Sequence, residues 1–238
     1  MTYTLRKVIF LFVAFVILAL MILAKIAPRK PEHQIDKETA VNIQREGLAA
    51  GEKNDWPMFH FGPKLQGYVQ NNLSDSLELL WKFKTDDEIK SSAAIAKGKV
   101  FIGSSDANVY AIDLENGSRV WSYKTGGPIE ATACVVDGTV YIGSADGFLY
   151  ALDMNTGRFK WKCQTEGKIS GSANWTGGEN GQDIQILVGS YDNQLYCLNS
   201  KDGKVVWSYE TDSYVNGTAA VYDGRIVFGG CDGMMHVV

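Results

Sequence analysis

The hydrophobic residues of this chain follow a pattern that repeats about every 40 residues. Its clearest markers are four tryptophans, spaced 40, 40 and 46 residues apart: Trp81, Trp121, Trp161 and Trp207. Between them lie short stretches of alternating apolar and polar residues, separated by Asp-Gly and Asn-Gly turns. A period of about 40 residues built from four short strands is typical of a β-propeller blade. The sequence therefore predicts an all-β propeller of about four four-stranded blades.

The unit that follows Trp121 shows the expected order of elements. A run of small residues comes first, then strand-like stretches at 139–143 and 148–153, and finally Trp161. The small-residue runs are expected to be the innermost strands, because neighbouring blades crowd together there and large side chains would clash. They are Ser91–Ala94, Ala131–Cys134, Gly171–Asn174 and Gly217–Ala220. The stretch 79–85 alternates in the same way and is also expected to be a strand.

The tryptophans are predicted to dock each blade on its neighbour, because a single blade cannot bury its own faces. A buried tryptophan removes about 150–250 Å² from water. A glycine turn is expected to join the third strand of each unit to the fourth, at Gly117, Gly157 and Gly203. Asp113 and Asp153 are expected to accept backbone N–H bonds in the same turns.

The third unit is longer than the others. It carries an insertion at 176–181 that accounts for its six extra residues. Such an insertion between two strands is expected to form a flexible surface loop.

Charge is distributed unevenly along the chain. The whole sequence has a formal net charge of −4, but residues 1–30 hold five basic residues and no acidic one. The rest of the chain is therefore at −9. An acidic body without a basic stripe is not expected to bind nucleic acid.

The N-terminal end is expected to anchor the chain in a membrane. Val8–Ala24 is an uncharged apolar run flanked by Arg6-Lys7 and Lys25, which places a single-pass helix in residues 1–27. No clean cleavage site follows, which favours an uncleaved signal anchor over a cleaved signal peptide. Residues 28–54 then form a polar stalk, with a partner-binding helix as the alternative, and 55–238 form the propeller. The propeller is expected on the extracytoplasmic side of the cell membrane, periplasmic or outer.

The repeated motifs resemble those of one family. Ala-x-Asp-x-x-Thr-Gly-x-x-x-Trp is met fully by residues 151–161, nearly by 111–121 and more loosely by 197–207. Together with the Trp-Pro-Met-Phe stretch at 56–59 and the Gly-Ser-x-Asp-Gly turns, these units look like pyrroloquinoline-quinone-type (quinoprotein-like) propeller repeats. The resemblance covers residues 55–238. At its start the chain departs from the usual pattern, with His60 where arginine is common and Leu65-Gln66 in place of His-Thr.

The resemblance implies a ring of seven or eight blades. Residues 55–238 are then expected to be an arc or half of a larger propeller, with self-association as one way to complete the ring. Alternatively, the strand around Trp81 closes four blades by completing the fourth.

The resemblance also raises an enzyme hypothesis, part of a quinone-dependent dehydrogenase. That activity implies the quinone with a calcium ion, a catalytic aspartate and a vicinal cysteine pair. The sequence has no Cys-Cys, and His33, His60 and His236 are scattered without ligand spacing. The repeated aspartates, Asp106, Asp146, Asp192 and Asp232, are explained as turn residues. No catalytic, cofactor or metal residue is therefore predicted.

The four cysteines each fall in a different unit: Cys134, Cys163, Cys197 and Cys231. They are expected to be small apolar residues inside strands. A disulfide stays open if the body is exported, but the sequence cannot pair them.

The favoured function is a protein-binding scaffold of the cell envelope, similar to the non-enzymatic envelope members of the family. Four residues just before the inner strands share one repeat position yet differ chemically, so repetition does not dictate them: Lys90, Glu130, Ser170 and Asn216. A third hypothesis is a module that binds polysaccharide or another small ligand, with Tyr191, Tyr214 and Trp175 stacking on a sugar.

Overall fold

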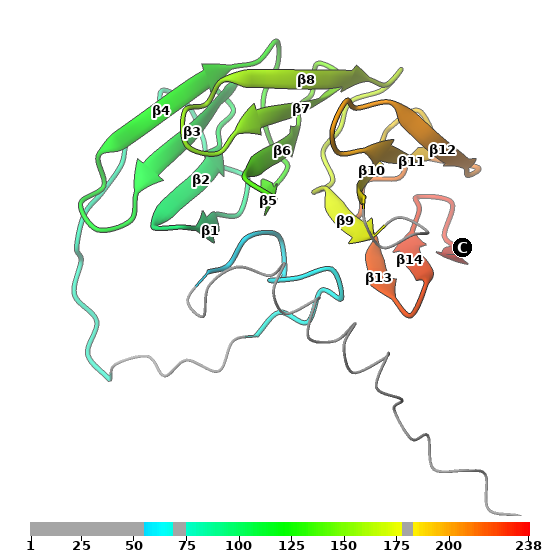
Figure 1. Ribbon diagram of the computed structural model, residues 1–238, viewed down its shortest axis with the longest axis horizontal. Coiled ribbons are helices and arrows are strands. Elements are labelled where there is room, and N and C mark those ends of the chain that lie inside the picture. The colour runs from blue at the N-terminus through cyan, green and yellow to red at the C-terminus, as the bar shows by residue number, and fades with distance from the viewer. Residues whose placement is uncertain (1–54, 69–74, 178–182) are drawn as a thin grey trace, which may run out of the picture. The chain divides into compact units, whose positions relative to one another are not determined.

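The computed structural model describes residues 55–68, 75–177 and 183–238. Within these ranges the chain forms three four-stranded antiparallel sheets and one three-stranded sheet, which we call blades 1 to 4. Figure 1 shows the blades following one another in chain order. The predicted all-β propeller architecture is confirmed, with the correction that blade 4 has three strands in the described chain.

The strands of each blade pair in sequence order. Blade 1 consists of β1 (Ala94–Ala96), β2 (Lys99–Gly103), β3 (Asn108–Asp113) and β4 (Arg119–Lys124). Blade 2 consists of β5 (Cys134–Val136), β6 (Thr139–Gly143), β7 (Phe148–Asp153) and β8 (Phe159–Gln164). Blade 3 consists of β9 (Asn174–Gly177), β10 (Ile184–Gly189), β11 (Gln194–Asn199) and β12 (Val205–Glu210). Blade 4 consists of β13 (Ala220–Tyr222), β14 (Arg225–Gly229) and β15 (Met235–Val237).

Several predictions about the N-terminal end lie outside the described residues. These are the membrane anchor in 1–27, the stalk in 28–54 and any helix within them. The described part of the chain contains no helix of the length and apolarity needed to cross a bilayer.

The small-residue runs are not themselves the innermost strands, as predicted, but lead into them. Each inner strand begins only at the last residue of its run, for example at Ala94 and Cys134. Residues of the first three runs that precede the strands bond from blade to blade. The Ser92 amide donates to the Thr132 hydroxyl (3.2 Å), and the Thr132 amide donates to the Ser172 hydroxyl (2.9 Å). Because these amides bond to the neighbouring blade, each inner strand begins three residues later than predicted.

Two further strand predictions need correction. The stretch 79–85 pairs with no strand among the described residues, so its alternating pattern does not correspond to a strand of a sheet. In the third unit, Thr176 and Gly177 continue β9, so the predicted loop is shortened at its start, and residues 178–182 lie outside the description.

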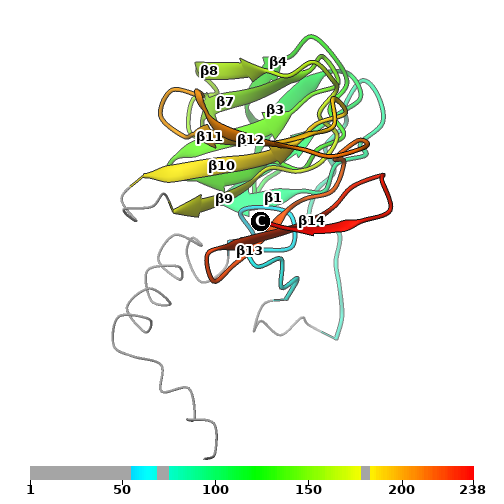
Figure 2. The same ribbon diagram turned by 90° about the vertical axis from the view of Figure 1, so that its right-hand side faces the viewer.

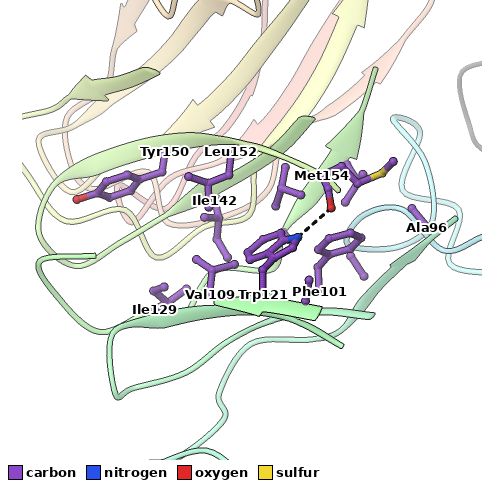
Figure 3. Close-up of a cluster of buried hydrophobic side chains, with 14 residues drawn as sticks. Ala96, Phe101, Val109, Trp121, Ile129, Ile142, Tyr150, Leu152 and Met154 are labelled. Carbon is purple, nitrogen blue, oxygen red and sulfur yellow. Dashed lines mark hydrogen bonds between the residues drawn. The ribbon is translucent and has the colours of Figure 1, made fainter. Parts of the chain in front are cut away.

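Each blade is joined to the next through a tryptophan. The indole N–H of Trp121 on β4 donates to the carbonyl of Met154, in the turn between β7 and β8 of the next blade (3.0 Å). The ring lies on Gly157 of that turn, where an added Cβ would be 2.7 Å from Cδ2 of the indole. Figure 3 shows this bond and the apolar residues from both blades around the ring. Gly157 is required twice, since its φ of +68° also disfavours any side chain.

The same contact recurs along the chain. Trp81 bonds the carbonyl of Leu114 (3.0 Å) and lies on Gly117, while Trp161 bonds the carbonyl of Ser200 (2.9 Å) and lies on Gly203. Trp207 differs, because it is only partly buried and the described residues place no turn glycine against its indole. The described chain thus contains three complete docking contacts.

The carboxylates in these turns cap the backbone. Oδ1 of Asp113 accepts the amides of Glu115 and Asn116 (both 3.0 Å), and Oδ1 of Asp153 accepts those of Asn155 and Thr156 (3.1 and 2.9 Å). The four other repeated aspartates lie in the turns between the second and third strands. Those turns define a second repeated network.

Asp146 is the best example of the second network. Its Oδ1 accepts the amide of Phe148 (3.1 Å), while Oδ2 accepts the amide of Gly126 (2.7 Å) and the hydroxyl of Tyr150 (2.6 Å). The carboxylate therefore ties its own turn to the linker that arrives from blade 1. Equivalent hydroxyl bonds join Tyr110 to Asp106 (2.7 Å) and Tyr196 to Asp192 (2.8 Å).

The fourth copy of this network uses a different donor. His236 occupies the tyrosine position, and its Nε2 lies 2.8 Å from Oδ2 of Asp232. The amide of Met234 and then His236 hold the pKa of Asp232 below its usual value.

The docking contact predicts a large stability effect. Trp121→Ala is expected to lower the free energy of unfolding by about 3–5 kcal/mol, because it opens a cavity between two blades and removes the bond to Met154. Trp207→Ala, at a partly buried tryptophan, serves as the control and is expected to lower it by about 1–2 kcal/mol. Urea unfolding followed by tryptophan fluorescence and circular dichroism measures both. Equal losses for the two variants would contradict the docking role.

The Asp–Tyr network predicts a loss of stability at alkaline pH. Burial and the bond to Asp106 raise the pKa of Tyr110 to about 12, and the same causes raise the pKa of Tyr150 and Tyr196. A tyrosine of the unfolded chain titrates near about 10. The stabilisation is therefore complete below about pH 10 and is lost as the pH rises through the folded-state pKa.

Urea midpoints between pH 8 and 11.5 measure this effect. Tyr150→Phe is expected to reduce the alkaline fall in the midpoint while costing about 1 kcal/mol at pH 8. Tyr222→Phe, at a tyrosine 62% exposed, is expected to keep the wild-type pH dependence. An identical alkaline fall in wild type and Tyr150→Phe would show that this network does not contribute.

Candidate functional site

The antiparallel order of the strands gives the blades two different faces. One face carries the turns between second and third strands together with the linkers between blades, residues 85–90, 125–130, 165–170 and 211–216; we call it the linker face. The amide of each turn donates to a linker carbonyl, as from Ser105 to Glu88 (2.8 Å) and from Ala145 to Pro128 (2.9 Å). The opposite face, the hairpin face, carries the first and third turns of each blade. The tryptophan docking turns lie on the hairpin face.

The four candidate binding residues are the last residues of the four linkers. The structure brings Glu130 and Ser170 together, with the Ser170 hydroxyl donating to the Glu130 carboxylate (3.1 Å). Lys90 instead forms an exposed ion pair with Glu88 (3.4 Å), and Asn216 is exposed. Equivalent positions of adjacent blades are thus neighbours, but only the middle pair is directly bonded among the described residues.

The linker face is acidic. Its linkers hold two lysines, Lys90 and Lys168, against six carboxylates: Asp86, Asp87, Glu88, Glu130, Glu166 and Asp212. The four network aspartates lie in the turns of the same face. Burial opposes ionisation of Asp106, but the bonds from Tyr110 and Asn108 outweigh it and lower the pKa of that carboxyl. In contrast, the described hairpin-face turns are nearly balanced, with four basic residues against five acidic ones: Lys97, Arg158, Lys201 and Lys204 against Glu115, Asp137, Asp183, Asp202 and Asp223.

Sequence reasoning missed the role of residues 55–65, which we call the lead-in segment. The amide and carbonyl of Trp56 bond the carbonyl and amide of Ile95 on β1 (both 2.7 Å). The carbonyl of Pro57 accepts the amide of Val135 on β5 (2.7 Å), and that of Pro63 accepts the amide of Val221 on β13 (2.8 Å). Figures 1 and 2 show the segment (cyan) beside these inner strands.

Blade 3 meets the lead-in segment through a side chain. The equivalent inner-strand amide, that of Trp175, donates to the Asn174 side-chain carbonyl (2.7 Å), and the Asn174 amide group donates to the carbonyls of Pro63 (2.9 Å) and Ala219 (2.6 Å). Met58 is fully buried among residues of blades 2 and 3. The lead-in segment therefore occupies the free edges of the inner strands. The apolar residues of 55–65 follow neither a strand nor a helix period, so the sequence does not reveal that this segment covers the strand edges.

The described residues do not fit a quinone with its calcium ion. They contain no group of three or more His, Cys, Asp or Glu side chains arranged to hold a metal ion. The carboxylate oxygens of the network aspartates already form hydrogen bonds with turn amides and with tyrosine or histidine side chains. The lead-in segment occupies the edges of the inner strands around which a central cavity would form. We derive no chemical step through such a cofactor.

The cysteines do not form a redox site in the described chain. All four are free, and burial raises the pKa of Cys134 and Cys197 to about 12. A thiol with a raised pKa holds little of the reactive thiolate at neutral pH. Cys134, Cys163 and Cys197 lie in strands as predicted, but Cys134 on β5 and Cys163 on β8 share blade 2 and do not fall in different units. Cys231 lies in an exposed turn, because it follows the end of β14.

Of the three aromatic residues suggested for sugar stacking, only two lie together at the surface in the structure. Trp175 is 8% exposed and belongs to the core, so it cannot present its ring to a ligand. Tyr191 and Tyr214 stack on each other, with ring centroids 4.9 Å apart, on the linker face. This stacking could not be predicted from the repeat, since the two residues are not at equivalent repeat positions.

Family models match two overlapping stretches of the chain. Residues 71–174 match the model described as outer membrane protein assembly factor BamB, and residues 124–226 match the β-propeller domain of glucose, ethanol and alcohol dehydrogenases. No curated protein sequence matches the chain.

Solved structures give the same fold. BamB from Moraxella catarrhalis is 20% identical with a TM-score of 0.58, over 67% of this chain and 49% of that one. Quinohemoprotein alcohol dehydrogenase from Comamonas testosteroni is 21% identical with a TM-score of 0.59, over 71% of this chain and 29% of that one. The computationally designed Ika4 protein is 18% identical with a TM-score of 0.59, over 68% of this chain and 98% of that one.

The chain spans about half the length of the BamB structure. At these identities the likeness of structure concerns the fold alone, while the two family models identify the type of repeat. The chain is therefore a β-propeller protein built from PQQ-type repeats.

Proposed function

We propose that this protein is a membrane-tethered, extracytoplasmic scaffold that binds envelope proteins with its linker face. One observation carries the proposal. The groups that recur in every blade are engaged inside the fold, including the first threonine of each linker and the buried Ile129, Ile169 and Val215. The remaining linker residues vary between blades and are exposed or partly exposed. Rigid strands that present variable loops on one face are the usual binding architecture of such folds.

The contrast is visible at single positions. The network aspartates bind turn amides, and the docking tryptophans bind the next blade. The last linker residue instead changes from Lys90 to Glu130, Ser170 and Asn216 along the chain. The BamB family model supports a role in binding, whereas the dehydrogenase propeller model matches a stretch of similar length and supports the enzyme as the alternative. The poor fit of the described residues to the quinone favours binding.

The tether is inferred from the sequence of the N-terminal end. Val8–Ala24 has the apolar length of a short spanning helix, flanked by basic residues. The acidic body that follows is compatible with exposure on the extracytoplasmic side. Self-association to complete a larger ring is a further element of the proposal.

The tether predicts a membrane fraction that resists extraction. The full-length chain is expected to stay in membranes washed with sodium carbonate at alkaline pH, with an intact N-terminus by mass spectrometry. Protease added outside the cytoplasmic membrane is expected to degrade the body. Retention of the chain in the soluble fraction, or protection of the body from external protease, would contradict this part of the proposal.

The scaffold role predicts that partners contact one face. A photo-crosslinking amino acid replaces Lys90, Glu130 or Asn216 in the full-length chain within its native envelope. Discrete crosslinked species are expected from these linker-face positions, because they vary freely and lie at the surface.

Glu115 and Lys201, exposed residues of the hairpin face, are the matched control positions. Crosslinking of equal strength from both faces would refute the linker-face assignment. Reconstitution with the quinone and calcium that yields alcohol or sugar oxidation would refute the scaffold role itself.

A further inference from the structure

The linker face carries an aromatic stack between blades 3 and 4. Tyr191, in the turn between β10 and β11, and Tyr214, in the following linker, stack with an interplanar angle of 21°. The Lys168 ammonium lies 4.3 Å from the centroid of the Tyr191 ring. Tyr191 is thus covered by Tyr214 and approached by the lysine. Tyr214 remains 48% exposed, although its partner ring is only partly exposed.

Repetition does not explain this stack. The position of Tyr191 is taken in the other blades by Ser105, Ala145 and Cys231, and their amides make the same bond to the linker carbonyl. The turn therefore forms with any side chain at this place. Blades 1 and 2 dock on their neighbours through an indole contact and without such an aromatic pair, so the stack is particular to the junction of blades 3 and 4.

Tyr214 presents its ring to solvent and stacks on the partly exposed ring of Tyr191. A partner that covers these rings removes their apolar surface from water. The backbone anchors them firmly, since the Tyr191 amide bonds the Lys168 carbonyl (3.0 Å) and the Cys231 amide bonds the Tyr214 carbonyl (2.8 Å). Their rings are therefore held in place before any ligand arrives, which reduces the ordering that binding requires.

The charge around the stack selects the ligand. The exposed carboxylates Asp212 and Glu166 lie in the two linkers that supply Tyr214 and Lys168. The linker face as a whole is rich in carboxylates, whereas the hairpin-face turns are nearly balanced. A planar cation satisfies both features, because an arginine guanidinium stacks on an aromatic face and bonds carboxylates with its fork of N–H donors.

We propose that the linker face docks an arginine-bearing extended segment of a partner protein, with a guanidinium stacked on Tyr214. Acidic linkers of blades 1 to 3 then attract the remaining basic residues of the segment. The inference rests on the proposed scaffold function and names the chemistry of its partner. A lysine side chain fits less well, since its compact ammonium lacks the plane and the fork of the guanidinium.

The test uses the full-length chain in neutral detergent micelles and two fluorescent peptides. One has three arginines separated by glycine and serine, and the other has lysines at the same places. Fluorescence anisotropy is expected to show tighter binding of the arginine peptide, weakened by salt. Tyr214→Ala is expected to weaken that binding about fivefold, whereas Tyr214→Phe keeps it.

Tyr222→Ala is the matched control, because Tyr222 is 62% exposed and also has a lysine ammonium near its ring, that of Lys64 at 5.1 Å. It lies at the hairpin-face end of β13 and is expected to leave binding unchanged. Equal binding of both peptides, or unchanged arginine-peptide binding in Tyr214→Ala, would overturn the inference. Those results leave the scaffold role standing if crosslinking still favours the linker face, so the two proposals fail separately.

Discussion

Blades 1, 2 and 3 are fixed to one another by indole rings, each of which lies on a glycine turn of the next blade and donates its N–H to a carbonyl of the same turn. The apolar face of the ring and its one polar group are both satisfied by the neighbouring blade. The contact therefore sets the separation and the register of two sheets at once. Because a Cβ on Gly157 would sit 2.7 Å from the ring, the turn must carry glycine, and tryptophan and glycine recur together in the sequence.

The same constraint separates structural from functional residues. Docking takes place on the hairpin face, and on the linker face the aspartate network ties the first three linkers to the turns that follow them. The linker threonines and the buried Ile129, Ile169 and Val215 hold each linker on the blades, so its other side chains are free to vary. The side chains differ between blades at positions where the fold constrains only the backbone, as at Lys90, Glu130 and Tyr214. This is the physical reason for placing the binding surface on the linker face.

The lead-in segment answers a different requirement. An inner strand without a neighbour exposes unpaired backbone groups at its edge, and such edges attract other chains. Here the carbonyls of Trp56, Pro57 and Pro63 accept the equivalent amides of three inner strands. In blade 3, Asn174 supplies the acceptor from its own side chain and reaches the segment with its amide group. A non-repeated stretch thus completes the repeated units.

The sequence by itself determined the period, the number of units, the glycine turns and the docking role of the tryptophans. These features follow from short-range patterns that the chain repeats, so a single sequence displays them clearly. The pairing of each docking indole with a glycine turn of the next blade, the limits of the inner strands, the path of residues 55–65 and the stacking of Tyr191 on Tyr214 were decided only by the tertiary structure. Each of them depends on contacts between residues that are not neighbours in the sequence, and the last two occur once, as in the bond between Asn174 and Pro63. A pattern along the sequence cannot signal a contact that it does not repeat.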